Sequence, residues 1–351
     1  MYTFESLMKI AVEHHSSDLH LSPGRVPSCR IDGQITGILP DKLTPADTQA
    51  IADEVLTEKH RRTLEETGEV DFATYEKDIG RFRLNIFRQR NSLAIVARIL
   101  NSEIPTPAAL GIPDSVVAAS QKKHGLILVT GPTGVGKTTT IASLLNQINL
   151  NAEKHIITLE DPIEYLHPHA KSIVNQREVG IDTRSFTTGL NSALREDPDI
   201  IFIGEMRDLD TIGSAITAAE TGHLIFSTLH TPGAFTAMDR IIDVFPNYQQ
   251  QQIRTQLAEV IECVVYQQLL PRADGKGRVA AMEVMLANNA VRNCIREGKI
   301  YQIPSIILTS KSEGMQTMDN AIASLYMDGR ITRDTAYAFA QDKDALKRKY
   351  I

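Results

Sequence analysis

The stretch of sequence that decides the fold reads Gly131-Pro132-Thr133-Gly134-Val135-Gly136-Lys137-Thr138. It carries the glycines, the lysine and the hydroxyl residue of a phosphate-binding P-loop. The apolar run before it, residues 126–129, predicts a buried strand, and residues 139–148 after it predict a helix. The glycines let backbone N–H groups turn inward around phosphate oxygens, and the helix N-terminus adds its positive end. The stretch therefore predicts a site for a nucleoside triphosphate.

Within this loop, Lys137 is expected to reach the β and γ phosphates of ATP, and the Thr138 hydroxyl is expected to ligate Mg²⁺. The loop and the residue after it form the predicted nucleotide-binding set: Gly131, Pro132, Thr133, Gly134, Val135, Gly136, Lys137, Thr138 and Thr139.

Length and composition limit what surrounds the loop. The 351 residues predict two domains rather than one core. The apolar fraction of 42% and the charged fraction of 23% are typical of a soluble globular protein, and we expect a cytoplasmic location because no signal peptide or membrane-spanning run is visible. A net charge of −6 argues against a protein that binds nucleic acid mainly by electrostatics. The three cysteines are far apart and favour neither a disulfide framework nor a zinc site.

The first hundred residues have the pattern of a small α+β domain. Residues 81–86 alternate, so that Phe82, Leu84 and Ile86 share one face of a strand and Arg81 and Arg83 share the other. These two arginines and three that follow give a local cationic surface: Arg81, Arg83, Arg88, Arg90 and Arg98. One interpretation is a solvated edge strand whose charges discourage aggregation. The other is a face that meets a phosphate held by another domain or subunit.

Proline and glycine interrupt the periodicity of residues 101–113, so this segment is the predicted linker between the domains. The domain before it is expected over residues 1–100 and the domain after it over residues 114–351. Within the second domain, residues 249–265 predict a helix.

Acidic residues follow two further predicted strands. Residues 156–159 lead into Glu160, Asp161 and Glu164, and residues 200–203 lead into Gly204-Glu205. Ligands of open α/β sheets lie beyond the carboxyl ends of the strands, so these carboxylates are candidates to hold Mg²⁺ or to orient the attacking water. The segment 200–205 resembles a Walker B strand, which usually ends in aspartate followed by glutamate, but glycine stands at position 204. Glu160 and Glu164 therefore become the candidate metal ligands. Glu205 becomes the candidate base. The simpler alternative is a polar loop with helix-capping carboxylates.

The buried run 224–227 lies between His223 and His230. A lone histidine is usually structural, but His230 is expected at the carboxyl end of a strand of the same sheet. There it would sense the γ phosphate or couple it to a neighbouring subunit.

Together these motifs resemble the Walker A, Asp box, Walker B and His box of the type II/IV secretion and pilus ATPases. The segment 290–299 also resembles a motif typical of the branch that drives type IV pilus retraction and twitching motility, the PilT family. That branch lacks the longer N-terminal extension and the tetracysteine zinc site of assembly relatives, and this sequence has neither.

The resemblance implies an α/β protein with an N-terminal PAS-like α+β domain, followed by a RecA-like P-loop ATPase core with a helical C-terminal part. It implies a hexamer that hydrolyses Mg-ATP and acts on an inner-membrane pilus platform protein, with a paralogous retraction ATPase as a possible partner. It also implies catalytic roles for His223 and His230, an approach of the five arginines to the triphosphate, and a coupling role for Arg292 and Arg296. A location at the cytoplasmic side of the inner membrane, through the pilus machine, follows from the same resemblance.

Other functions stay open on the sequence. The same chemistry serves pilus assembly and type II secretion. A RecA-like nucleic-acid motor is opposed by the acidic charge balance, and no nucleic-acid partner is expected. A scaffold that binds ATP without hydrolysing it is a further alternative.

Overall fold

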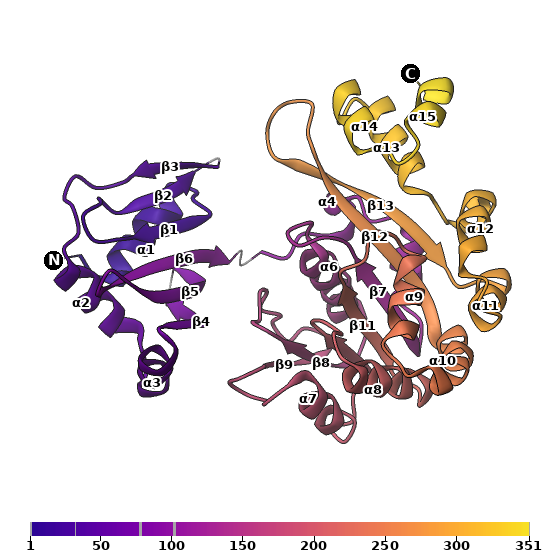
Figure 1. The fold of residues 1–351 in the computed structure, drawn as a ribbon, viewed down its shortest axis with the longest axis horizontal. Coiled ribbons are helices and arrows are strands. Elements are labelled where there is room, and N and C mark those ends of the chain that lie inside the picture. The colour runs from indigo at the N-terminus through magenta and orange to yellow at the C-terminus, as the bar shows by residue number, and fades with distance from the viewer. Residues whose placement is uncertain (1, 32, 77–78, 101–102, 351) are drawn as a thin grey trace. The chain divides into compact units, whose positions relative to one another are not determined.

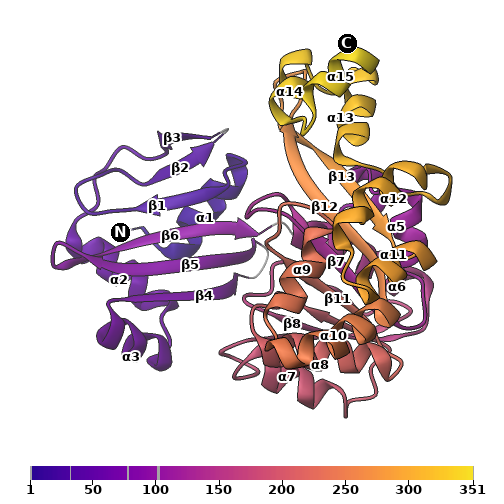
Figure 2. The same cartoon turned by 45° about the vertical axis from the view of Figure 1, so that its right-hand side comes forward.

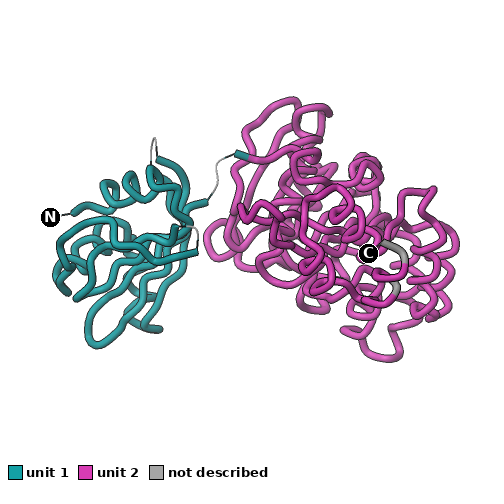
Figure 3. Tube along the Cα trace, turned by 90° about the horizontal axis from the view of Figure 1, so that it is seen from above, with its two compact units in different colours: residues 1–103 teal, residues 104–351 magenta. Residues whose placement is uncertain are grey.

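The structure is a computed structural model that describes residues 2–31, 33–76, 79–100 and 103–350. The chain forms two compact units, Met1–Glu103 and Ile104–Ile351 (Figure 3). The predicted linker over residues 101–113 is thus too long. Helix α4 (Pro107–Leu110) belongs to the second unit, and the Ser143 hydroxyl donates to the Pro105 carbonyl over 2.6 Å. Proline can start a helix at its first position, so this proline-rich segment is helical where a linker was expected; residues 101–102 lie outside the described residues.

The first unit is a six-stranded antiparallel sheet in the order β3-β2-β1-β6-β5-β4, with helices α1 to α3 (Figure 1). Its elements are α1 (Phe4–Glu13), β1 (Asp18–Leu21), β2 (Ser28–Ile31), β3 (Gln34–Gly37), α2 (Pro45–Val55), α3 (Glu58–Thr67), β4 (Glu69–Glu76), β5 (Gly80–Gln89) and β6 (Ser92–Leu100).

The core of this unit lies on one face of the sheet. Phe82, Leu84 and Ile86 of β5 are fully buried and pack with α1 and α2 residues, as the alternation predicts. Arg81 and Arg83 are half-buried on the opposite face. The strand pattern is therefore confirmed.

The second unit is built on a seven-stranded sheet in the order β13-β12-β7-β11-β10-β8-β9. All neighbouring pairs are parallel except β12 with β13, which are antiparallel. The strands are β7 (Gly125–Thr130), β8 (His155–Glu160), β9 (Ile173–Glu178), β10 (Ile200–Ile203), β11 (Leu224–Leu229), β12 (Ile261–Pro271) and β13 (Arg278–Leu286).

Helices cover both faces of this sheet. One face packs against α5 and α6, and the other against α7 to α10. The remaining bounds are α5 (Asp114–Ala119), α6 (Lys137–Asn151), α7 (Phe186–Ala193), α8 (Leu209–Glu220), α9 (Thr236–Asp243), α10 (Asn247–Val260), α11 (Asn289–Arg296), η1 (Ile300–Gln302), α12 (Ile303–Thr309), η2 (Lys311–Glu313), α13 (Met318–Met327), α14 (Arg333–Phe339) and α15 (Lys343–Tyr350).

The β12–β13 hairpin is long and reaches the C-terminal helices α13 to α15 (Figure 2). Its first strand starts earlier than expected, because the sequence predicts helix to Val265 whereas α10 ends at Val260. The run from Ile261 to Val265 is rich in β-branched side chains and pairs with the P-loop strand β7, so sheet contacts override the helical pattern.

Replacing Leu84 by alanine is expected to destabilise the first unit by about 2–5 kcal/mol, because it leaves a cavity in a fully buried position. Hydrogen–deuterium exchange of β5 amides in the full chain, at increasing urea, measures this loss. Asn85→Ala, one residue along on the other face, is the matched control and should stay within about 0.5 kcal/mol of wild type. Equal protection in both variants would contradict the assignment of the core face.

Candidate functional site

Four parallel strands of the second unit end at the same edge of the sheet. β7 leads into the P-loop, β8 ends at Glu160, β10 is followed by Gly204-Glu205 and β11 is followed by His230. The strands pair in register, so these side chains lie along one edge. The structure thus brings together motifs that are spread over residues 131–230 of the sequence.

The P-loop wraps from β7 to α6 with left-handed backbone at its glycines. Gly131 has φ 141° and Gly136 has φ 87°, a region that favours glycine. A Cβ on Gly131 would also lie 2.5 Å from the Gln267 carbonyl oxygen, so β12 leaves no room for a side chain there. The other predicted nucleotide residues complete the loop and first turn, with Pro132, Thr133 and Gly134 exposed, Val135 buried, and Thr138 and Thr139 half-buried.

Lys137 bends back over the loop that precedes it. Its ammonium donates to the carbonyl oxygens of Gly131 and Pro132 over 2.9 and 3.0 Å. Burial lowers the pKa of Lys137 below its usual value, against the opposing influence of Glu205 and Glu164. The ammonium is therefore held at the mouth of the loop, next to the inward N–H groups.

His230 bridges Lys137 and Glu205. Its Nδ1 lies 3.4 Å from the Lys137 ammonium, and its Nε2 lies 3.3 Å from Glu205 Oε1. An ammonium has only donors, so Nδ1 accepts and the ring proton of a neutral His230 lies on Nε2, facing the carboxylate. The tautomer is thus set by its two neighbours.

Glu205 also pairs with Arg207, whose Nη2 lies 2.7 Å from Oε2. Partial burial pushes the pKa of Glu205 upward, but the hydrogen bond and charge of Arg207, with His230 and Lys137, hold it below its usual value. The carboxylate is therefore ionised and polarised by three cationic or donor groups.

Gly204 stands where a Walker B aspartate is usual. A Cβ there would lie 3.2 Å from the Leu159 carbonyl oxygen and 3.5 Å from the Phe186 ring. The neighbouring strand and α7 thus leave little space for a carboxylate at this position.

Glu160 lies inside the fold, with 5% of its surface exposed. Its Oε1 accepts from the Thr158 hydroxyl over 2.6 Å and from the Gln176 amide over 3.1 Å. Burial raises its pKa to about 7. This arrangement counts against the prediction of Glu160 as a direct Mg²⁺ ligand, because the side chain is buried and its Oε1 is already engaged by Thr158 and Gln176.

The rest of the acidic segment differs from Glu160. Asp161 is exposed and Glu164 is half-buried, with an electrostatic influence on Lys137. The next residue, Tyr165, places its hydroxyl 3.0 Å from the Thr139 hydroxyl of α6. The segment after β8 is therefore fastened to the first turn of the P-loop helix.

His223 does not join this site. It precedes β11, at the end of the strand opposite to His230, and its Nδ1 lies 2.9 Å from the Ala218 carbonyl oxygen at the end of α8. A strand of six residues spans about 20 Å, so His223 lies at the far end of β11 from Lys137 and Glu205 of the same chain, and its catalytic role stays a prediction. The two histidines flank the same strand but lie at opposite edges of the sheet.

The five arginines of the first unit fall into two groups. Arg81 and Arg83 share the open face of β5, and Arg98 lies directly opposite Arg83 on β6. Arg88 and Arg90 are exposed near the β5–β6 turn, about 20 Å away along the strand. The predicted single cationic surface is therefore divided.

Two members of the first group are bound to carboxylates of their own unit. The Arg83 guanidinium makes a bidentate contact with Asp71, with Nη2 2.8 Å from Oδ2. Arg98 Nε donates to Asp18 over 3.0 Å. These two would have to exchange a carboxylate for any phosphate they approach.

Arg292 and Arg296 do not form a cationic stripe. Arg292 turns inward, donating to the carbonyl oxygens of Ala258 and Glu259 at the end of α10, and pairs with Glu262 over 2.8 Å. Arg296 donates to Asn293 of its own helix. Arg292 thus joins α11 to α10 and β12 in this structure.

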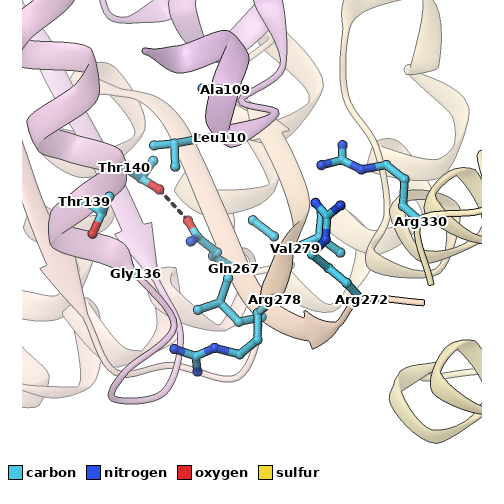
Figure 4. Close-up of a pocket in the computed structure, with 12 residues that line it drawn as sticks. Ala109, Leu110, Gly136, Thr139, Thr140, Gln267, Arg272, Arg278, Val279 and Arg330 are labelled. Carbon is cyan, nitrogen blue, oxygen red and sulfur yellow. Dashed lines mark hydrogen bonds between the residues drawn. The ribbon is translucent and has the colours of Figure 1, made fainter. Parts of the chain in front are cut away.

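A pocket of about 220 Å³ opens behind the first turn of α6 (Figure 4). Apolar residues including Leu110, Leu269 and Val279 line it, together with three arginines. Arg278 reaches the carbonyl oxygen of Gly134 over 3.5 Å. The pocket combines an apolar wall with cationic groups beside the P-loop; its arginines are Arg272, Arg278 and Arg330.

Several residues of the site were missed by the sequence reasoning. Gln267 and Arg278 come from the β12–β13 hairpin, more than 120 residues after the loop, and carry no motif. Arg207 follows Glu205 by two residues, so its position next to Walker B was the available signal. Tyr165 follows the acidic segment, but nothing in the pattern directed its hydroxyl to Thr139.

Glu160→Gln is expected to remove a pH dependence of stability. The pKa of Glu160 is higher in the folded chain, about 7, than the ordinary value of 4.5, so the folded state holds an extra proton between these values and wild-type stability falls as pH rises through them. The melting temperature of the variant relative to wild type should therefore be higher at pH 8 than at pH 5. A difference that does not change with pH would contradict the buried acid form.

Several known proteins are similar to this chain in both sequence and fold. A sequence profile of the family described as Type II/IV secretion system protein matches residues 3–332. The type IV pilus retraction ATPase PilT of Pseudomonas aeruginosa is 44% identical over 94% of this chain and 96% of its own, and the type IV pilus ATPase PilU of that organism is 40% identical over 98% and 90%. A crystal structure of the pilus retraction motor PilT with bound ADP superposes with a TM-score of 0.93, at 49% identity, over 99% of this chain and 100% of that one. The chain therefore belongs to the type II/IV secretion system protein family and, within it, to the ATP-hydrolysing pilus-retraction ATPases of the PilT type.

Proposed function

We propose that this ATP hydrolase is a hexameric motor that powers type IV pilus retraction and twitching motility. The observation that carries the proposal is the contact series from Lys137 through His230 and Glu205 to Arg207, at the edge where the P-loop opens. It joins the phosphate-binding lysine to the candidate base, so that binding or loss of the γ phosphate would affect both side chains. The similarity to proteins named for pilus retraction supports the choice of machine.

The nucleotide is proposed to lie across the P-loop, with its phosphates on the loop N–H groups and Lys137. The adenosine would extend into the pocket behind α6, where the apolar residues Leu110 and Leu269 suit a purine and the arginines suit the ribose and α phosphate. An ADP-bound relative of the same fold supports nucleotide use.

Mg²⁺ fits the donors that the chain offers. Among the described residues, no cluster of three or more His, Cys, Asp or Glu side chains is placed to hold a metal ion. Mg²⁺ in phosphate sites takes few protein ligands and completes its shell with water and phosphate oxygens, so the Thr138 hydroxyl with Glu164 nearby suits it. The ion would neutralise phosphate charge when bound.

Glu205 is proposed to accept the proton of the attacking water. His230, whose Nε2 faces Glu205 and whose Nδ1 faces Lys137, would hold the carboxylate in place and respond to the γ phosphate through Lys137. The arginine that stabilises the transition state is proposed to come from the first unit of the same or a neighbouring copy, with Arg81 and Arg83 first; Arg83 would have to leave Asp71 to do so.

We infer further that the first unit is a PAS-like domain and the second a RecA-like core. The central position of β1 beside β6 in an antiparallel sheet supports the first assignment, and the P-loop strand inside a mostly parallel sheet supports the second. No helix in the described part of the chain is both long and apolar enough to cross a membrane. Contact with the membrane would then occur through a platform protein of the pilus machine, on the cytoplasmic side.

A second candidate role is that of an accessory to a paralogous retraction ATPase, because one organism, Pseudomonas aeruginosa, carries two relatives of this chain, PilT at 44% and PilU at 40% identity. Deleting the gene separates the roles. Loss of retraction with excess surface pili supports a motor, normal retraction under low load supports an accessory, and loss of pili supports assembly.

Lys137→Ala and Glu205→Gln are expected to fail in different steps. The lysine variant loses phosphate contacts and should bind ATP at least about tenfold more weakly. The glutamine variant keeps the shape of Glu205 without the base, so it should bind ATP normally and lose about 10²–10⁴-fold in kcat. Nucleotide titration and steady-state hydrolysis measure the two effects, and normal turnover by Glu205→Gln would remove the proposed base.

Arg207→Gln is expected to move the acid limb of the pH profile of kcat/KM to higher pH. The pKa of Glu205 is lowered by Arg207, so its removal raises that pKa and protonates the base earlier as pH falls. The matched control is Arg184→Gln, an exposed arginine in the loop before α7. An unchanged acid limb in Arg207→Gln would show that Glu205 is not the group that titrates.

A further inference from the structure

Gln267 is a buried polar residue that neither the motifs nor the proposed chemistry employs. It follows the last residue of β12 that pairs with β7, so its backbone lies beside the start of the P-loop. Its side chain is 3% exposed, and both ends of its amide are occupied. A buried amide with both hydrogen bonds made holds its partners in a fixed geometry.

The amide of Gln267 connects the P-loop to the helix behind it. Its Nε2 donates to the Val135 carbonyl oxygen over 2.6 Å, and its Oε1 accepts from the Thr140 hydroxyl over 2.7 Å (Figure 4). The Val135 carbonyl oxygen can only accept, so it selects the NH2 end of the amide, and the amide oxygen is left to accept from the Thr140 hydroxyl. The donor end is thereby directed to the loop.

The contact with Val135 determines the direction of one loop amide. In a trans peptide unit the C=O and the following N–H point to opposite sides. With the Val135 carbonyl drawn toward β12, the N–H of Gly136 is turned the other way, to the concave side of the loop where phosphate oxygens would bind. Gly136 has left-handed backbone, which glycine adopts without strain; its own carbonyl oxygen accepts from the Thr140 N–H, and the peptide before it is held by Gln267.

We infer that Gln267 is a positioning residue of the phosphate site, which pre-orients the Gly136 N–H for a β phosphate. The inference rests on the proposed nucleotide site and deepens it. Gln267 does not contact the reacting atoms; it acts through the Val135–Gly136 peptide. Its effect belongs to binding of the diphosphate part, which is shared by ground state and transition state, so it changes KM and not kcat.

The test uses Gln267→Met in the full chain, which keeps the length of the side chain and removes both hydrogen bonds. The expected result is a rise of about tenfold in KM for ATP and in the Kd for ADP, with kcat within about twofold of wild type. A merely structural role would lower the melting temperature and the active fraction, which reduces kcat and leaves KM unchanged.

The matched control is Gln268→Met. Gln268 is the next residue of β12, points to the other face of the strand and donates to the Tyr266 hydroxyl. Its variant should keep the wild-type KM and Kd. Thr140→Val, which frees the acceptor end of the Gln267 amide, should raise KM in the same direction by a smaller factor.

Each outcome decides the inference. Wild-type KM and Kd in Gln267→Met, or a fall in kcat alone, overturns it while leaving the proposed function intact. Failure of the unmodified protein to bind ADP overturns the proposed function and the inference together, and is recognised before any variant is made. If Gln267→Met does not fold, Thr140→Val decides, and a wild-type KM in that variant overturns the inference.

Discussion

Parallel pairing of β7, β8, β10 and β11 is the constraint on which the rest of the second unit depends. Because the strands run in the same direction and in register, whatever follows each strand is delivered to one edge. Lys137, Glu205 and His230 meet there although each comes from a different segment. The opposite ends of the same strands receive residues with structural contacts, and His223 is the example.

The sequence predicted the elements that depend on local pattern. The P-loop, the alternation of Phe82 and Leu84, and the strand before Glu205 are each defined by residues within one segment, so their periodicity and spacing suffice. The end of α10 was misplaced because Ile261 and its neighbours belong to a strand only through their pairing with β7, which no local pattern encodes.

Side-chain direction was the part of the site that could not be predicted. Glu160 and Glu164 are four residues apart in one acidic segment, yet Glu160 is buried against Thr158 and Gln176 while Glu164 stays near Lys137. Arg292 has the pattern of a surface cation, but its guanidinium donates to the carbonyl groups at the end of α10. Gln176 and Ala258, which help to decide these outcomes, are 16 and 34 residues away in the sequence from the side chains that they contact.

The strand β12 carries Glu262, which is clamped by Arg292, and Gln267, which holds the P-loop, only five residues later. At the rise of a β-strand this is about 17 Å of extended backbone, of which residues 263–266 pair with both β7 and β13. A strand paired on both sides resists stretching and bending far better than a loop does. β12 therefore provides a continuous stretch of strand between the Arg292 contact of α11 and the Gln267 contact with the phosphate loop.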